Sequence, residues 1–243
     1  MIFRLVIALA LAGGLSGCKV SSIDAKKNEK RTIPVVTTSQ LTEQDVFGNE
    51  ATLNISEEDI QDALGGEQIV VPVHSSVILV QSGNQAPEAV MQQEMSKYYT
   101  VSTFPGIPAK KNVALCNKDA VDTENMNYMQ ALRYIAAKGK QRAILVYWGR
   151  LETGRFDPVT KGVLWSEYKN EKLTRGDTIY RYLLRFAVVD VDTGEWATYS
   201  PTNYEYSKQV SFTDFNGITE QQLIQLKAKT YERVVADFVN RFK

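Results

Sequence analysis

Two runs of the chain are entirely apolar, and they constrain its fold more than any other feature. One covers residues 77–80, at the end of a predicted strand over 69–81, and the other covers residues 143–148. Continuous apolar runs of this length are typical of strands that are covered on both faces, as in parallel sheets. The sequence therefore predicts a layered α/β domain with at least two buried strands.

The segments around these runs alternate between helix and strand patterns. A helix is predicted to begin with Pro87 as its first residue, because Met91, Met95 and Tyr98 recur at helical spacing. A strand follows over 99–104 and is expected to stop at Pro105. The next predicted helix covers 125–138, with Ile135 among its apolar face. Strand, helix, strand, helix and strand in this order predict a βαβαβ unit with parallel pairing.

The second half of the chain has the pattern of an antiparallel hairpin followed by a long helix. Strands are predicted over 163–168 and 180–191, and the second alternates apolar side chains with Arg181 and Arg185. A tight turn at 192–194 leads to a returning strand at 195–199. Thr219 and Gln222 form a capping pattern for a final helix. Its apolar face has a 3.6-residue period: Tyr231, Val234, Val235, Phe238 and Phe242. The expected fold is α/β: a three-layer-like mixed sheet with a βαβαβ start, an antiparallel hairpin and a C-terminal helix.

The first seventeen residues have the pattern of a secretory signal peptide. Arg4 precedes an apolar run over 5–12, which is too short to cross a bilayer core of about 30 Å. Leu15-Ser-Gly-Cys18 then resembles the bacterial lipobox, which implies cleavage before Cys18 and attachment of lipid to its thiol. Lys19 follows the cysteine, and by resemblance to enterobacterial lipoproteins this favours the outer membrane.

The predicted organisation is a signal peptide over 1–17, a flexible tether over 18–66 and a globular domain over 67–243. The tether is polar, and a coil of roughly 50 residues has a root-mean-square span of about 40 Å. It contains one short helix, opened by a capping pattern from Ser56 to Asp59 and ended by Gly65 and Gly66. We expect this helix to pack against the edge of the domain.

Composition argues against several classes of function. The chain has 28 basic and 28 acidic residues, and the mature chain has a net charge of about −1, because Arg4 is removed. This balance does not favour nucleic acid as a partner. His74 is the only histidine, and its position at the entrance to a strand favours a structural role. No nucleophile, zinc or phosphate-loop motif occurs, so we expect no catalytic residue, cofactor or metal.

The remaining cysteine, Cys116, has no intramolecular partner once Cys18 carries lipid. It is interpreted as a small buried hydrophobe, with a reactive thiol as the alternative. Asp190 and Asp192 flank the predicted turn. Their spacing is similar to the start of a calcium loop, but the distal ligands are missing, and turn chemistry accounts for both carboxylates.

Three segments carry a resemblance to known domains. They are residues 75–80, 143–149 and 187–196, and their order is similar to that in the curli-secretion protein CsgG, the penicillin-binding-protein activator LpoB and the amino-terminal domain of TolB. The resemblance covers residues 69–243 as an architecture. The segments 147–152 and 191–196 look more closely like those of a group of uncharacterised proteobacterial lipoproteins. CsgG carries a pore-forming hairpin of long alternating strands, for which residues 150–178 here are polar and short.

The candidate binding surface follows the apolar run at 143–148, where open α/β sheets place ligand crevices. Its residues are Tyr147, Trp148, Arg150, Glu152 and Trp165. A long loop is expected over 150–178, with Phe156 and Trp165 as aromatic anchors. The alternative is a belt of strand-end aromatic side chains that seals the core.

These observations predict an outer-membrane-anchored, periplasm-facing lipoprotein that acts as a non-catalytic binding or accessory factor of the cell envelope. Its expected partners are the membrane, through the lipid anchor, and a periplasmic protein. One alternative is a peptidase-like hydrolase that uses carboxylates and a metal, and another is a sensor that binds a small ligand beside Trp148. The sequence leaves the oligomeric state open.

Overall fold

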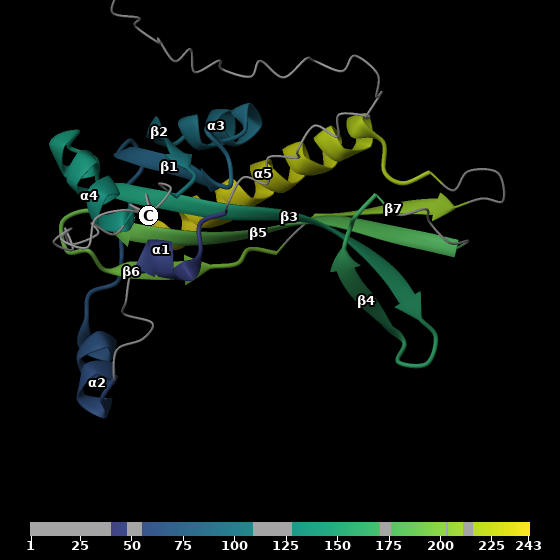
Figure 1. Ribbon diagram of the computed structural model, residues 1–243, viewed down its shortest axis with the longest axis horizontal. Coiled ribbons are helices and arrows are strands. Elements are labelled where there is room, and N and C mark those ends of the chain that lie inside the picture. The colour runs from purple at the N-terminus through teal and green to yellow at the C-terminus, as the bar shows by residue number, and fades with distance from the viewer. Residues whose placement is uncertain (1–39, 48–54, 109–127, 171–175, 203, 211–215) are drawn as a thin grey trace, which may run out of the picture. The chain divides into compact units, whose positions relative to one another are not determined.

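A computed structural model describes residues 40–47, 55–108, 128–170, 176–202, 204–210 and 216–243 of the chain (Figure 1). The predicted signal peptide, Cys18 and Cys116 lie outside the described residues. The described strands are β1 (Ser76–Ser82), β2 (Thr100–Gly106), β3 (Ala143–Asp157), β4 (Gly162–Glu167), β5 (Gly176–Asp190), β6 (Trp196–Tyr199) and β7 (Glu205–Val210). The described helices are α1 (Glu43–Phe47), α2 (Glu57–Gly65), α3 (Ala89–Ser96), α4 (Tyr128–Lys138) and α5 (Glu220–Phe242).

The seven described strands form one mixed sheet. The main strand order is β2-β1-β3-β5-β6, while β4 also pairs with β3 and β7 also pairs with β5. β1 pairs in parallel with both β2 and β3, and the remaining pairs are antiparallel. The predicted α/β fold is confirmed, including its parallel first half, its antiparallel hairpin and its C-terminal helix.

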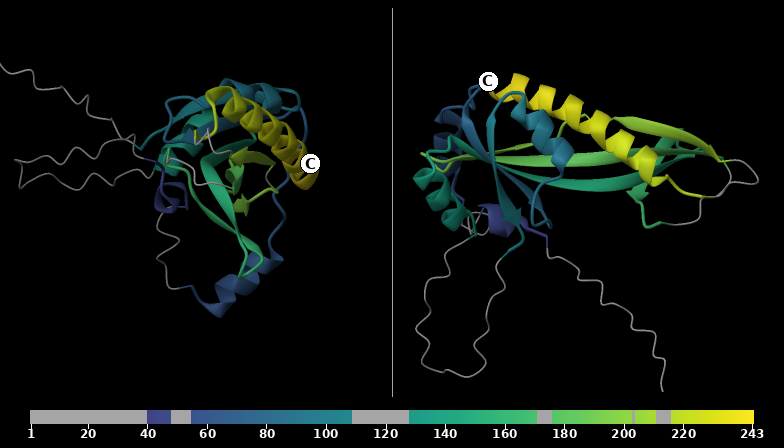
Figure 2. Two further views of the ribbon diagram at one scale, coloured as in Figure 1. Left: turned by 90° about the vertical axis from the view of Figure 1, so that its right-hand side faces the viewer. Right: turned by 90° about the horizontal axis from the view of Figure 1, so that it is seen from above.

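Helices cover both faces of this sheet (Figure 2). On one face, Met91 and Met95 of α3 and the apolar side of α5 pack on alternate residues of β1, β3 and β5. On the other face, Met129 and Leu132 of α4 and the segment 41–47 pack on the intervening residues of the same strands. The apolar runs at 77–80 and 143–146 are buried throughout because successive side chains enter opposite cores.

Several predicted boundaries of the first half are wrong. β1 begins at Ser76 rather than at residue 69. Pro87 precedes α3, whose N-cap residue is Glu88. Pro105 lies within β2, which pairs with β1 alone among the described strands. An edge strand tolerates a residue without an N–H group. Ile135 of α4 is exposed rather than part of the apolar face.

The loop expected over 150–178 is largely strand, and this is the main correction to the predicted fold. β3 continues nine residues beyond Trp148 to Asp157, and β4 returns along it as a hairpin. β3 and β5 each contain 15 residues, and their pairing from Ala143 to Arg155 holds the polar half of β3 in the sheet. β7, for which no strand was expected, pairs with the first half of β5.

The segment 41–47 belongs to the packed unit, although by sequence it falls in the tether. Leu41 and Val46 are each 2% exposed, and Phe47 stacks on Trp196 with ring centroids 4.2 Å apart. α2 has the predicted capping box between Ser56 and Asp59. None of its residues is buried, so the expected packing of α2 against the edge of the domain is wrong.

Candidate functional site

The five predicted surface residues do not share one face of the sheet. β3 is regularly paired with β5 through this region, so successive residues alternate between the faces. Tyr147 is fully buried in the core beneath α5, and its hydroxyl donates to Oε1 of Gln81 at 2.8 Å. Its predicted place on the binding surface is therefore wrong. Trp148, Arg150 and Glu152 lie on the opposite face.

Trp148 joins the sheet to the segment that precedes α1. Its indole Nε1 donates to the carbonyl oxygen of Leu41 at 2.9 Å. The guanidinium of Arg185, from the neighbouring strand β5, lies 5.8 Å from the centre of the indole ring. Trp148 is half-buried, so one part of the ring seals the core and another part is accessible. The buried part agrees with the core-seal interpretation, and the binding-surface interpretation of the accessible part stays a prediction.

Glu152 is buried between two arginines. Its Oε2 accepts from Nη2 of Arg181 at 2.7 Å and from Nε of Arg181 at 2.8 Å, while Oε1 pairs with Arg150. The guanidinium of Arg181 also stacks on the indole of Trp165, 4.0 Å from the ring centre. One carboxylate therefore orients two cations. The three charged side chains together have a net charge of +1.

Six side chains thus gather on one face of the sheet, and we call them the Trp–Arg patch: Trp148, Arg150, Glu152, Trp165, Arg181 and Arg185. The patch lies where β3 and β5 continue past Tyr147, the last residue of β3 that pairs with β1. Arg150 and Arg185 are exposed, and Trp148, Trp165 and Arg181 are half-buried. This arrangement presents planar aromatic and guanidinium groups in fixed orientations. It is suited to binding, and it contains no described nucleophile paired with a base.

The two arginines of β5 were not among the predicted site residues. The alternation of residues 180–191 places Arg181 and Arg185 on the same side of their strand. Only the register Glu152↔Arg181 and Trp148↔Arg185 brings them to the predicted residues of β3. The alternation along this strand could have indicated that the two arginines share a face. The sequence did not specify the register that brings them beside the residues of β3.

A second polar cluster lies beneath α5, and no sequence pattern indicated it. Glu88 accepts from Nζ of Lys227 at 2.7 Å and from the hydroxyl of Tyr231 at 2.9 Å. Its backbone N–H donates to Gln81, which also accepts from Tyr147. Burial raises the pKa of the Tyr147 and Tyr231 phenols above their ordinary value, so both remain neutral hydrogen-bond donors at physiological pH. The cluster joins α5 and the start of α3 to the end of β1 and to the first half of β3.

The acidic turn after β5 is a structural feature. Oδ1 of Asp190 accepts from the backbone N–H groups of Asp192 and Thr193, at 2.9 and 3.1 Å. Its Oδ2 pairs with Arg142 at 2.8 Å. Turn chemistry therefore accounts for the carboxylate of Asp190, as the sequence indicated, whereas the exposed carboxylate of Asp192 pairs with Arg142 at 3.4 Å. Within the described ranges, no group of three or more His, Cys, Asp or Glu side chains lies close enough to hold a metal ion.

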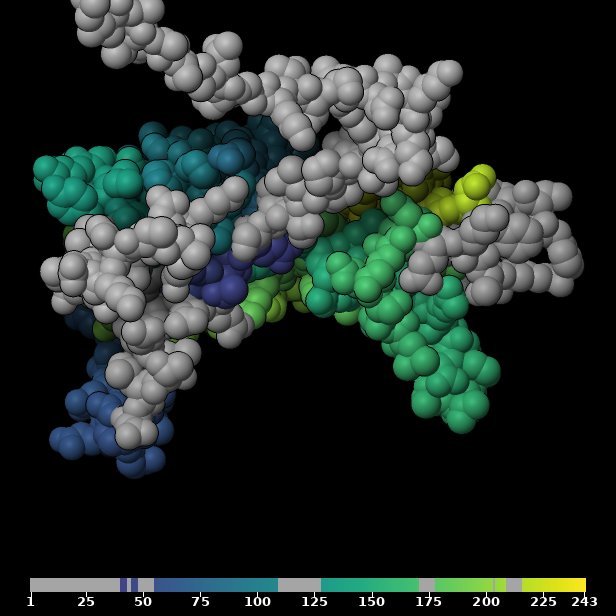
Figure 3. Space-filling model, in the orientation of Figure 1, coloured from purple at the N-terminus to yellow at the C-terminus, as the bar shows by residue number. Residues whose placement is uncertain are grey.

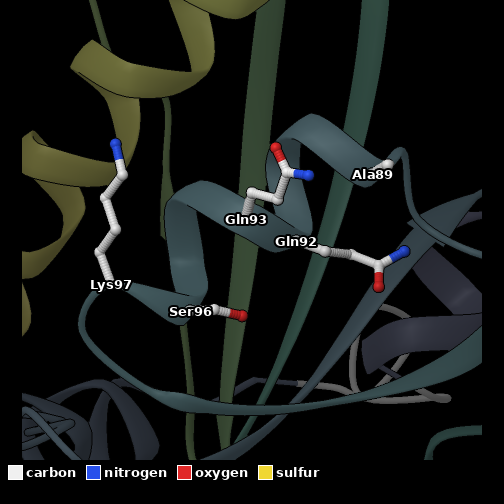
Figure 4. A pocket seen from close by; sticks show the side chains of 5 residues that line it. All are labelled: Ala89, Gln92, Gln93, Ser96 and Lys97. Atoms are coloured by element: carbon white, nitrogen blue, oxygen red, sulfur yellow. The ribbon is translucent and has the colours of Figure 1, made fainter.

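Two further features lie apart from the Trp–Arg patch. His74 is an exposed turn residue with a φ of 67°. Its backbone N–H donates to the carbonyl oxygen of Tyr98 at 2.6 Å. This hydrogen bond joins the turn before β1 to the turn before β2. A hollow of about 470 Å³ lies along α3 (Figure 4). It is lined by four residues of this helix and by Lys97 directly after it; the four are Ala89, Gln92, Gln93 and Ser96. The hollow contains none of the predicted site residues.

The fold and the patch together define an α/β domain that presents tryptophan and arginine side chains on one face of its sheet. Among the described residues, no helix is both long enough and apolar enough to cross a bilayer. The chain belongs to the YafT bacterial lipoprotein family, whose model matches residues 42–241. A comparison with curated proteins finds no match.

Three solved structures are similar to parts of the chain. A putative neuraminyllactose-binding hemagglutinin homolog from Helicobacter pylori is 11% identical, with a TM-score of 0.29, over 73% of this chain and 88% of that one. A minor lipoprotein from Acinetobacter baumannii is 14% identical, with a TM-score of 0.30, over 71% and 92%. Lipoprotein GNA1162 from Neisseria meningitidis is 12% identical, with a TM-score of 0.23, over 68% and 99%. At these TM-scores the three structures carry no argument about function.

Proposed function

We propose that this lipoprotein is held in the outer membrane by lipid on Cys18, faces the periplasm and acts there as a non-catalytic binding factor of the cell envelope. Its membership of a bacterial lipoprotein family supports the anchor. The signal pattern over 1–17 and Lys19 after the cysteine support export and the outer membrane. The resemblance to the CsgG, LpoB and TolB domains agrees with an accessory role and stays a prediction from sequence.

The Trp–Arg patch is the observation that carries the binding role. Tryptophan and arginine, together with tyrosine, are enriched among the residues that contribute most of the binding energy at protein interfaces. Here Glu152 holds Arg150 and Arg181, and Trp165 stacks on Arg181, so these groups are already oriented before a partner arrives. Pre-orientation lowers the entropy cost of binding. A folded periplasmic protein with acidic and aromatic side chains is the partner that this surface fits.

Site-specific photo-crosslinking in intact cells tests this role. A photoreactive residue is placed at Arg150 or Arg185 within the patch, and at Gln93 on α3 as the exposed control. We expect one discrete adduct from the patch positions, none from position 93, and loss of the adduct when Arg181→Glu is added. Equal adducts at all three positions, or none at the patch, would overturn the proposed binding surface.

The anchor has a separate test. Cells grown with an alkyne-bearing fatty acid should label the chain, and Cys18→Ala should abolish the label. Lys19→Asp should move the lipidated chain to the inner membrane in a density gradient. A wild-type chain that stays unlabelled would refute the lipid anchor, whatever the crosslinking shows.

A further inference from the structure

The tip of the β3–β4 hairpin exposes three large apolar side chains. Phe156 is 61% exposed, Val159 is 88% exposed and Leu164 is 61% exposed. The hairpin projects from the rest of the sheet, and the space-filling view shows it standing clear of its neighbours (Figures 1 and 3). Phe156 and Leu164 lie on opposite faces of the hairpin, because Leu164 pairs with Arg155 and Phe156 pairs with Val163. The exposed apolar side chains therefore surround the end of the hairpin on both faces, which suits an environment that encloses the tip.

The hairpin has a defined conformation. Asp157 accepts from the backbone N–H of Val159 at 2.8 Å and from the hydroxyl of Thr160 at 3.0 Å, and these bonds fix the turn. A side chain at Gly154 would overlap Val163 and Trp165, so glycine at this position lets β4 pack closely on β3. The apolar tip is therefore presented on a preformed hairpin.

The charge around the tip indicates which apolar environment it meets. Arg155 and Lys161 are exposed beside the apolar side chains. The carboxylate of Asp157, between them, accepts two hydrogen bonds of the turn and keeps its negative charge, so the two cations leave the tip with a net charge of +1. Apolar side chains flanked by cations are typical of segments that enter the boundary between acyl chains and anionic headgroups. A protein partner would need a groove with an apolar floor and acidic side chains around its edge to match the tip in the same way.

We infer that the tip of the β3–β4 hairpin contacts the lipid bilayer and enters its headgroup region. This inference rests on the proposed anchor at Cys18. The packed unit begins by Leu41, whose N–H is bonded to Ser82 and whose carbonyl is bonded to Trp148. The 22 residues between Cys18 and Leu41 reach at most roughly 80 Å at full extension. The anchor therefore keeps the bilayer within reach of the domain at all times.

An environment-sensitive fluorophore at the tip tests the inference. The lipidated full chain carries Cys116→Ala, and a thiol-reactive NBD group is attached to Val159→Cys; Cys18 does not react because lipid occupies it. The protein is reconstituted in vesicles of three parts phosphatidylethanolamine to one part phosphatidylglycerol. The matched control carries the probe at Ile224→Cys on α5, a side chain that is 55% exposed. We expect at least a twofold rise in emission at position 159, with a blue shift, and little change at position 224.

Nitroxide-labelled lipids identify the source of the change. They should quench the probe at 159 and spare the probe at 224, and Phe156→Ser with Leu164→Ser should remove most of the rise. A chain that floats with the vesicles but keeps a water-like, unquenched probe at 159 overturns the hairpin inference alone. A chain that does not float refutes the anchor instead. If emission rises at position 159 but nitroxide-labelled lipids do not quench the probe, the tip contacts protein rather than lipid. That result also overturns the inference.

Discussion

At the scale of single residues, Glu152 organises the Trp–Arg patch. The residue is 4% exposed, and its carboxylate accepts from Arg181 while pairing with the more exposed Arg150. Removing a charge from water is costly unless its partners remain, so the acid and its arginines stabilise the fold only as a group. This makes Glu152 a more sensitive position than either cation.

The first prediction concerns Glu152→Gln. The substitution leaves the partly buried guanidinium of Arg181 without its anion, and we expect it to destabilise the domain by about 1–3 kcal/mol, less than a fully buried pair because Arg150 reaches solvent. Urea unfolding followed by circular dichroism measures this loss. The control, Arg150→Gln, removes the exposed partner and should cost less than about 1 kcal/mol. Equal costs for the two variants would contradict this account of the patch.

Sequence alone located part of this site. Trp148, Arg150 and Glu152 share a face because they are two residues apart on one strand, and Trp165 joins them through the pairing Gly154↔Trp165. Tyr147 was misplaced because neighbouring strand residues point to opposite faces. The contribution of β5 depends on a register across about thirty residues of chain, which local patterns do not specify.

At the scale of elements, two helices begin with the same motif in different surroundings. Ser56 and Asp59 form a capping box on α2, and Thr219 and Gln222 form one on α5. α5 buries eight residues, whereas α2 buries none. The capping hydrogen bonds of α5 therefore stabilise a helix that is part of the core, whereas those of α2 stabilise an exposed helix.

The second prediction compares the two caps. Thr219→Ala removes the acceptor for the N–H of Gln222 and should cost about 1 kcal/mol of global stability. Ser56→Ala should change global stability by about 0.5 kcal/mol or less, because the start of α2 is not part of the folded core. Hydrogen exchange should nevertheless show faster exchange along α2 in the second variant. A large loss of global stability from Ser56→Ala would mean that α2 is packed after all.

The elements that sequence predicted well carry a strong period or an apolar run. α5 and the apolar halves of β1 and β3 are examples, because burial alone determines them. The polar half of β3 has neither signal, and its strand conformation depends on pairing with β5 and β4. α1 has only five residues, too few for a period, and its place is decided by the burial of Leu41 and Val46.

At the scale of the whole molecule, tyrosines connect the sheet to the helices above it. The ring of Tyr231 on α5 meets Tyr147 and Tyr182 edge-on, and Tyr99 meets Phe238 in the same way. Burial raises the pKa of Tyr99 to about 12 and that of Tyr180 to about 12. The folded state therefore favours the neutral phenols.

The third prediction follows from the sign of these shifts. A phenol whose pKa is higher in the folded state stabilises the fold fully below its unfolded value of about 10, and this stabilisation is lost as the pH rises towards 12. We expect unfolding in this window, with ionisation of the buried tyrosines at 295 nm and loss of circular dichroism occurring together. In Tyr99→Phe the pH dependence should be shallower between pH 10 and 12. Full tyrosine ionisation at pH 11 with intact circular dichroism would contradict the prediction.

The attachment of Leu41 also has a mechanical consequence. With the proposed lipid anchor at Cys18, a pull along the chain would reach the domain at Leu41, through its bonds to Ser82 at the end of β1 and to Trp148 on β3. Leu41 is held by isolated hydrogen bonds and by burial rather than by a strand ladder, so we expect the segment 41–47 to detach before any strand slides. We expect the segment to rebind when the load ends, so that the sheet would keep its shape throughout.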